Sequence, residues 1–229
     1  MKKRMFVALL LVAILTIGAV LPASAATGSW KINTKVGTYL SKADKTVFNK
    51  AVKGMKGVTY TPVLKLAEQT VNGTNYAFLC TAKAVASSPK NSWKVLIINA
   101  SPAGEAELLK VNSFSYKSPK TLKTPYKSSS DAGSWVYSKQ GKSSKGVPSA
   151  AKKAFDKTVK KLDGISLTAL ALLSTQVVSG TNYRFLCRGK TVGKSSTSCL
   201  YVVDVYKNAK GKCKVSSCSV LNLPKYLKY

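Results

Sequence analysis

The chain has 229 residues, 45% of them hydrophobic, which is enough for one or two domains with cores of their own. Its 37 Lys and Arg residues against 8 Asp and Glu give a formal net charge of +29. Histidine is absent, which excludes the Ser-His and Cys-His pairs of nucleophilic hydrolases. The acidic residues form no evident pair and no metal-spaced cluster, so we expect no enzyme, no cofactor and no metal site.

The first residues have the three parts of a secretory signal peptide. Residues 2–4 are basic, residues 6–20 are mainly apolar, and residues 23–25 are Ala-Ser-Ala, a small-x-small cleavage site. We therefore predict a signal peptide over residues 1–25 and a secreted, extracellular protein. The apolar run is shorter than the ~20 residues of a membrane span, and no later run is long enough, so we expect no transmembrane segment after cleavage.

Cleavage after residue 25 removes three basic residues, which leaves the mature chain at 29 − 3 = +26. Such a charge favours association with anionic surfaces through long-range attraction. The lysines are spread along the chain, and no basic element with interleaved aromatic residues is present. We therefore expect no specific nucleic-acid partner.

An internal repeat organises the rest of the chain. Residues 69–80 (Gln-Thr-Val-Asn-Gly-Thr-Asn-Tyr-Ala-Phe-Leu-Cys) recur as residues 176–187 (Gln-Val-Val-Ser-Gly-Thr-Asn-Tyr-Arg-Phe-Leu-Cys), an offset of 176 − 69 = 107. Gly28-Ser29-Trp30 also recurs, as Gly133-Ser134-Trp135. The stretch between the copies is rich in Ser, Lys and Pro, which is typical of a linker. We predict domains over residues 26–116 and 133–229, with a linker over residues 117–132.

Each copy begins with apolar residues at helical spacing, which predicts one helix per copy. These residues are Phe48, Ala51, Val52 and Met55 in the first copy and Phe155, Thr158, Val159 and Leu162 in the second. Segments rich in β-branched and aromatic residues follow, and they predict strands. In the first copy they cover residues 58–71, 76–85, 93–98 and 107–114, and in the second the clearest covers residues 201–206.

One helix followed by four strands is an α+β pattern. We therefore expect each domain to be one helix packed on a four- to five-stranded antiparallel sheet, with two copies in tandem. One face of each sheet would contact the helix and the other would face water. Asn72-Gly73 is a strong signal for a two-residue hairpin turn between the first two long strands, and Ser179-Gly180 is its weaker counterpart.

A helix, then a strand ending in Gln-x-Val-x-Gly, then Thr-Asn-Tyr opening the next strand, resembles the cystatins. Residues 69–73 and 176–180 both fit the five-residue motif, and residues 176–183 match its extended form, Gln-Val-Val-x-Gly-Thr-Asn-Tyr, at every defined position. The helix over residues 152–159 also resembles the helix of that family. The similarity covers most of the chain after the signal peptide, apart from the linker.

The resemblance implies a secreted, reversible inhibitor that blocks the active-site cleft of papain-like cysteine proteases. In that family the wedge has three parts: an N-terminal glycine segment, the Gln-x-Val-x-Gly hairpin and a second hairpin with Pro-Trp. Carried over to this chain, the protease-binding residues are Gln69, Val71, Asn72 and Gly73, then Gln176, Val177, Val178, Ser179 and Gly180, with Gly28, Trp30, Gly133 and Trp135 from the N-terminal element. Gly37 and Gly146 are rival candidates for the N-terminal glycine.

The second hairpin departs from the family, because neither copy has Pro-Trp. Loss of the tryptophan removes a large apolar contact of the kind that often dominates binding energy, so weaker or altered selectivity is expected. The alternative interpretation is that the motif recurs because the fold needs a tight hairpin there. The chain would then be a non-inhibitory binding module that attaches to anionic cell-surface polymers.

The five cysteines are Cys80, Cys187, Cys199, Cys213 and Cys218. Secreted cystatins join their last two strands by a disulfide, so the resemblance implies a Cys199–Cys218 bond. Cys80 and Cys187 share a predicted face with neighbouring phenylalanines, which favours buried thiols over reactive ones.

Overall fold

The computed structural model describes residues 28–34, 40–86, 91–116, 133–138, 146–192 and 198–229. The predicted signal peptide, the predicted linker and Gly37 lie outside the described residues. No helix in the described part of the chain is long and apolar enough to cross a membrane.

The first copy forms a five-stranded antiparallel sheet in the order β1-β2-β3-β4-β5. Its elements are β1 (Trp30–Ile32), α2 (Lys42–Val52), β2 (Val58–Val71), β3 (Gly73–Ala84), β4 (Asn91–Ala100) and β5 (Ala106–Ser113). Helix α2 ends at Val52, so Met55 lies beyond it and is exposed.

The second copy repeats the series as a sheet in the order β10-β9-β8-β7-β6. Its elements are β6 (Trp135–Tyr137), α3 (Ser149–Val159), β7 (Ile165–Val178), β8 (Gly180–Thr191), β9 (Ser198–Asn208), β10 (Cys213–Val220) and the short 3₁₀ helix η2 (Leu223–Tyr226). Helix α3 ends before Leu162, which the sequence pattern had included.

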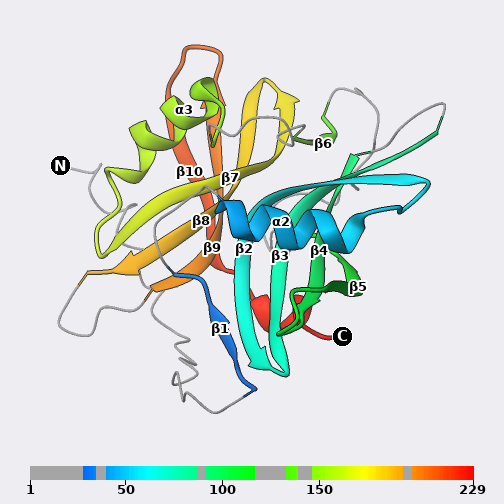
Figure 1. Cartoon of the computed structure of the whole chain (residues 1–229). Coiled ribbons are helices and arrows are strands. Elements are labelled where there is room, and N and C mark those ends of the chain that lie inside the picture. The colour runs from blue at the N-terminus through cyan, green and yellow to red at the C-terminus, as the bar shows by residue number, and fades with distance from the viewer. Residues whose placement is uncertain (1–27, 35–39, 87–90, 117–132, 139–145, 193–197) are drawn as a thin grey trace.

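Both faces of each sheet are apolar, because successive side chains of a strand point to opposite faces. In β3, Ala77 and Leu79 point one way, Phe78 and Cys80 point the other way, and all four are fully buried. The outer face packs on the helix: Phe48 of α2 meets Phe78 edge-to-face, with ring centroids 5.5 Å apart. Figure 1 shows α2 lying across the strands of the first sheet and α3 beside those of the second.

The inner faces of the two sheets pack against each other in one core. The residues of the first copy that contribute to it include Leu79, Val95 and Ile97, and those of the second include Leu173, Leu186 and Val202. The core also carries a hydrogen bond across the sheets, in which the indole Nε1 of Trp93 donates to the carbonyl oxygen of Leu173 at 2.6 Å.

The prediction of an α+β fold made of two tandem helix-on-sheet domains is therefore wrong. The structure is mostly sheet, with two five-stranded antiparallel sheets and two α-helices of 11 residues each among the described residues. The face of each sheet that was expected to meet water meets the other sheet. A single helix cannot cover both apolar faces of a sheet, so each copy buries its second face against its partner.

The chain also crosses between the sheets after the last strand of each copy. Phe114 follows β5 and is buried in the shared core. The segment after β10 returns to the first sheet, where the side-chain amide of Asn112 donates to the carbonyl oxygens of Tyr226, at 3.0 Å, and Lys228, at 2.9 Å. These crossings bind each copy to the other.

Replacing Leu79 by Ala tests the shared core. We expect the free energy of unfolding to fall by about 2–5 kcal/mol, because the change leaves a cavity between the sheets. Both copies should lose structure in one cooperative transition, measured by urea denaturation followed by circular dichroism and tryptophan fluorescence. Val85→Ala, at an exposed position just after β3, is the control and should change stability by less than about 0.5 kcal/mol. Two well-separated transitions in the parent protein would contradict the shared core.

Candidate functional site

Three segments meet at one end of each sheet. In the second copy, Trp135 of β6 pairs with Gln176 of β7, and Gly180 of β8 pairs with Asn208 of β9. The Gly-Ser-Trp segment, the Gln-x-Val-x-Gly hairpin and the next hairpin therefore lie side by side. The first copy has the same arrangement, with Trp30 opposite Gln69.

The glutamine of each motif holds these segments together. Gln176 is only 1% exposed. Its Nε2 donates to the carbonyl oxygen of Gly133 at 2.8 Å, and its Oε1 accepts from Nδ2 of Asn182 at 2.7 Å. In the first copy, Nε2 of Gln69 likewise donates to the carbonyl oxygen of Gly28. Each glutamine, predicted to bind a protease, is engaged in hydrogen bonds within the protein itself.

The glycine of each motif is needed because a neighbouring strand passes close by. Gly73 has φ +90°, and a Cβ there would collide with the carbonyl oxygen of Ala100. A Cβ on Gly180 would collide with the carbonyl oxygen of Lys207 and with the ring of Tyr206. Both glycines are thus explained by packing within the sheet, without any partner.

The remaining motif positions are exposed at the hairpin ends. Val177 is 63% exposed, Val178 43% and Val71 36%. Asn72 and Ser179, at the two turns, are also exposed. The neighbouring strand β9 stabilises the second turn, because the hydroxyl of Tyr206 donates to the carbonyl oxygen of Ser179 at 3.1 Å.

The two tryptophans of the N-terminal element are in different environments. Trp135 is 2% exposed and lies under Arg184, whose guanidinium carbon is 4.2 Å from the centroid of the tryptophan ring. Trp30 is half-buried, with its ring against Tyr229 at a centroid distance of 6.3 Å. Trp135 therefore has almost no surface to offer a partner. Gly146, the rival N-terminal glycine, precedes α3 and belongs to none of the paired strands.

A buried ion pair lies just below the second hairpin and was missed in the sequence. Arg184 donates from Nε and from a terminal nitrogen to the two carboxylate oxygens of Asp204, both at 2.7 Å. Both side chains are 2% exposed. Arg184 also donates to the carbonyl oxygen of Tyr116 from the first copy, at 3.1 Å. The visible signal was a charged residue flanked on both sides by apolar or aromatic residues, Tyr-Arg184-Phe in β8 and Val-Asp204-Val in β9.

The C-terminal residue was also missed, because its position gave no indication that it would reach the first copy. The hydroxyl of Tyr229 donates to Oε1 of Gln69 at 2.9 Å and accepts from Nδ2 of Asn75 at 2.8 Å. The second copy therefore completes the hydrogen bonding of the first hairpin. The second hairpin instead has Arg184 and Trp135 beneath it.

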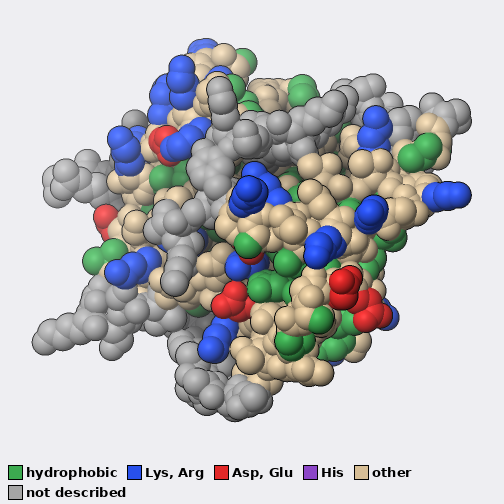
Figure 2. All heavy atoms as spheres, viewed as in Figure 1, with side chains coloured by type: hydrophobic (Ala, Val, Ile, Leu, Met, Phe, Trp, Pro, Cys, Tyr) green, Lys and Arg blue, Asp and Glu red, His purple; other side chains and the backbone are tan. Residues whose placement is uncertain are grey.

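The two hairpin ends lie far apart. In Figure 1 the end of β2 and β3 is at the bottom and the end of β7 and β8 is at the top. Basic side chains occur over much of the viewed face, and several gather over α3 (Figure 2).

The five cysteines, all within the described residues, are free thiols. The expected Cys199–Cys218 disulfide is not formed. Cys218 of β10 lies opposite Val203 of β9. Cys199 precedes Val203 by 203 − 199 = 4 residues, which along a strand is about 13 Å. A disulfide needs Cα atoms within about 7 Å. Burial raises the pKa of Cys218 to about 11.

Thiol labelling tests this arrangement. At pH 8 the half-buried Cys199 and Cys213 should react with iodoacetamide first. Cys187 and Cys80 should resist until the protein unfolds, because burial raises the pKa of each thiol and blocks access to it. The measurement is mass spectrometry of peptides from native and urea-treated protein. A peptide in which Cys199 is bonded to Cys218 would contradict the structure.

Replacing Gln176 by Leu tests whether the motif glutamine holds the hairpin end together. We expect a loss of about 1–3 kcal/mol in the free energy of unfolding, because Asn182 and Gly133 lose a buried partner. Val177→Ala, one position along and exposed, should cost less than about 0.5 kcal/mol. Equal effects of the two changes in urea denaturation would show that Gln176 has no such role.

Comparisons with known proteins do not assign the chain to a family. No protein-family model matches its sequence, and no curated protein matches it. The resemblance to the cystatins therefore depends on the repeated motif and its setting.

Proposed function

We propose that the chain, in an extracellular setting, blocks the active-site cleft of a papain-like cysteine protease with the end of its β7–β8 hairpin. The observation that carries the proposal is the pair of exposed valines, Val177 and Val178, at the end of a hairpin that is buttressed on both sides. The end of β2–β3, with Val71, is a second and weaker inhibitory element.

The hairpin end is preorganised for binding. The bond from Gln176 to the Gly133 carbonyl holds one side, and the contact of Gly180 with the neighbouring β9 holds the other. Little conformational entropy is lost when such a rigid end enters a cleft. The valines supply apolar contact. Binding in this way does not require a peptide bond of the inhibitor to lie at the catalytic cysteine, so the inhibitor is not cleaved.

The two ends differ in what they offer a protease. The second end carries two exposed valines, whereas the first carries Val71 and the exposed Asn72. The second should bind more tightly, because apolar area at the centre of an interface dominates binding energy. Since the two ends point in opposite directions (Figure 1), one molecule can engage two proteases.

The double change Val177→Asp with Val178→Asp tests the proposal. We expect the inhibition constant for papain to rise by about tenfold or more, because two desolvated apolar contacts are lost and carboxylates are placed in the cleft. Val71→Asp should have a smaller effect. The measurement is residual papain activity against inhibitor concentration, using residues 26–229.

The matched control is the double change Val85→Asp with Val192→Asp, which places the same two charges on valines that are 73% and 71% exposed, just beyond β3 and β8. It should leave inhibition unchanged. Gly180→Glu is unsuitable as a test, because its side chain would collide with β9 and disturb the fold. The proposal fails if excess parent protein slows neither papain nor a cathepsin-type enzyme.

A second candidate function is attachment to anionic cell-surface polymers. It is favoured by the mature charge of +26 and by the basic side chains over α3 (Figure 2). The two functions differ in their response to salt. Binding to a polymer should weaken steeply as salt increases, whereas inhibition that depends on valines should change little.

A further inference from the structure

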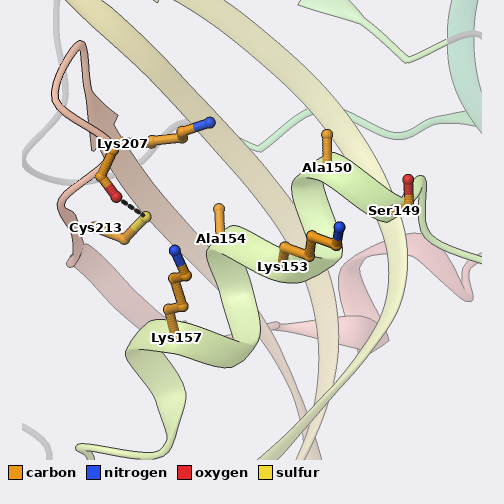
Figure 3. A pocket seen from close by; sticks show the side chains of 8 residues that line it. Ser149, Ala150, Lys153, Ala154, Lys157, Lys207 and Cys213 are labelled. Carbon is orange, nitrogen blue, oxygen red and sulfur yellow. Dashed lines mark hydrogen bonds between the residues drawn. The ribbon is translucent and has the colours of Figure 1, made fainter.

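We propose that a pocket between α3 and the β9–β10 hairpin binds a phosphate group through Lys153, Lys157 and Lys207. The pocket has a volume of about 240 Å³. One wall is α3, from Ser149 to Lys157, and the other is the hairpin, including Gly211 and Cys213. Figure 3 shows Lys157 directed toward Cys213 of the hairpin, whereas Lys153 extends along α3 toward Ser149.

The three ammonium groups are unpartnered within the described residues. No acidic residue lines the pocket, and none of the three side chains has a hydrogen-bond acceptor or an ion-pair partner there. By contrast, the neighbouring Lys152 is paired with Asp156 at 2.6 Å. Like charges four residues apart on a helix, such as Lys153 and Lys157, destabilise it slightly. A bound anion would remove that repulsion.

The first copy is an internal comparison. At the offset of 107, its counterparts of Lys153, Lys157 and Lys207 are Thr46, Lys50 and Ala100. The one lysine that remains, Lys50, already donates from Nζ to the carbonyl oxygen of Gly104 at 2.9 Å. The same backbone arrangement therefore lacks the cluster of three free cations. The cluster is specific to the second copy and is no consequence of the fold.

The start of α3 adds to the positive potential at the pocket. Its N-cap, Pro148, makes no side-chain capping bond, and its first turn holds no acidic residue. In the first copy, Ser41 and Asp44 form a capping box at the start of α2. The free N–H groups of a helix start favour anions. Ser149 and Ala150 of this first turn line the pocket.

A phosphate group fits these features better than a carboxylate does. A terminal phosphate carries up to two negative charges and three acceptor oxygens, which suits several donors around one pocket. The group can come from a soluble phosphate compound or from a surface polymer, in which each phosphodiester carries one charge and two free oxygens. The pocket does not depend on the proposed protease inhibition. If the chain attaches to a surface polymer, this pocket would be the site at which the polymer binds.

The test uses residues 26–229 and isothermal titration calorimetry with pyrophosphate, and separately with poly(glycerol phosphate). The variant is K153Q/K157Q/K207Q, which keeps most of each side chain. The control is K160Q/K161Q/K190Q, which removes the same charge from exposed positions outside the pocket. Circular dichroism checks that both variants fold. No protease is present, so the result is independent of the inhibition assay.

We expect the pocket variant to weaken pyrophosphate binding by about tenfold or more and the control to change it by less than about twofold. If pyrophosphate also displaces the polymer, and only the pocket variant loses polymer binding, the polymer is a source of the phosphate group. If pyrophosphate binds and the polymer does not, the source is a soluble compound. Equal weakening by the two variants, or no saturable binding by the parent, would overturn the proposal.

Discussion

Burial of apolar surface between the two sheets is the interaction on which the rest of this structure depends. Each sheet has two apolar faces, and its single helix covers one of them. The other face, which includes Leu79 and Val95 in the first copy, can leave water only against the second sheet. Neither copy is therefore expected to keep its structure alone. The crossing segments strengthen the dependence, since Phe114 and Leu223 both fill the common core.

This packing also determines which parts of the Gln-x-Val-x-Gly motif are available for function. The glutamines tie neighbouring segments together, and the glycines admit the adjacent strand. Both residue types would be required in a protein that inhibits nothing. The positions that the fold leaves free are the valines and the turn residues, above all Val177 and Val178. The protease inhibition that we propose therefore depends on these side chains, and substitutions there test it without disturbing the fold.

Local structure could be predicted from the sequence, whereas the packing of the sheets could not. The strand predicted over residues 58–71 is β2 (Val58–Val71), because its residue types and the following Asn-Gly turn are local signals. The contact of Tyr229 with Gln69 joins residues 160 positions apart, and no local pattern encodes it. The Cys199–Cys218 disulfide was implied by the resemblance alone, and the register of β10 on β9 sets the two cysteines apart.

The two copies share a backbone plan and differ in the side chains that carry charge. Arg184 and Asp204 replace Ala77 and Ile97, at equivalent positions in the two inner faces. Neither charge would be tolerated alone, because an unpaired buried charge is strongly destabilising, so the two must occur together. The lysines around the α3 pocket follow no such structural need. In the described part of the chain none of the three has an ion-pair partner. The phosphate group that we propose for this pocket would supply the opposite charge.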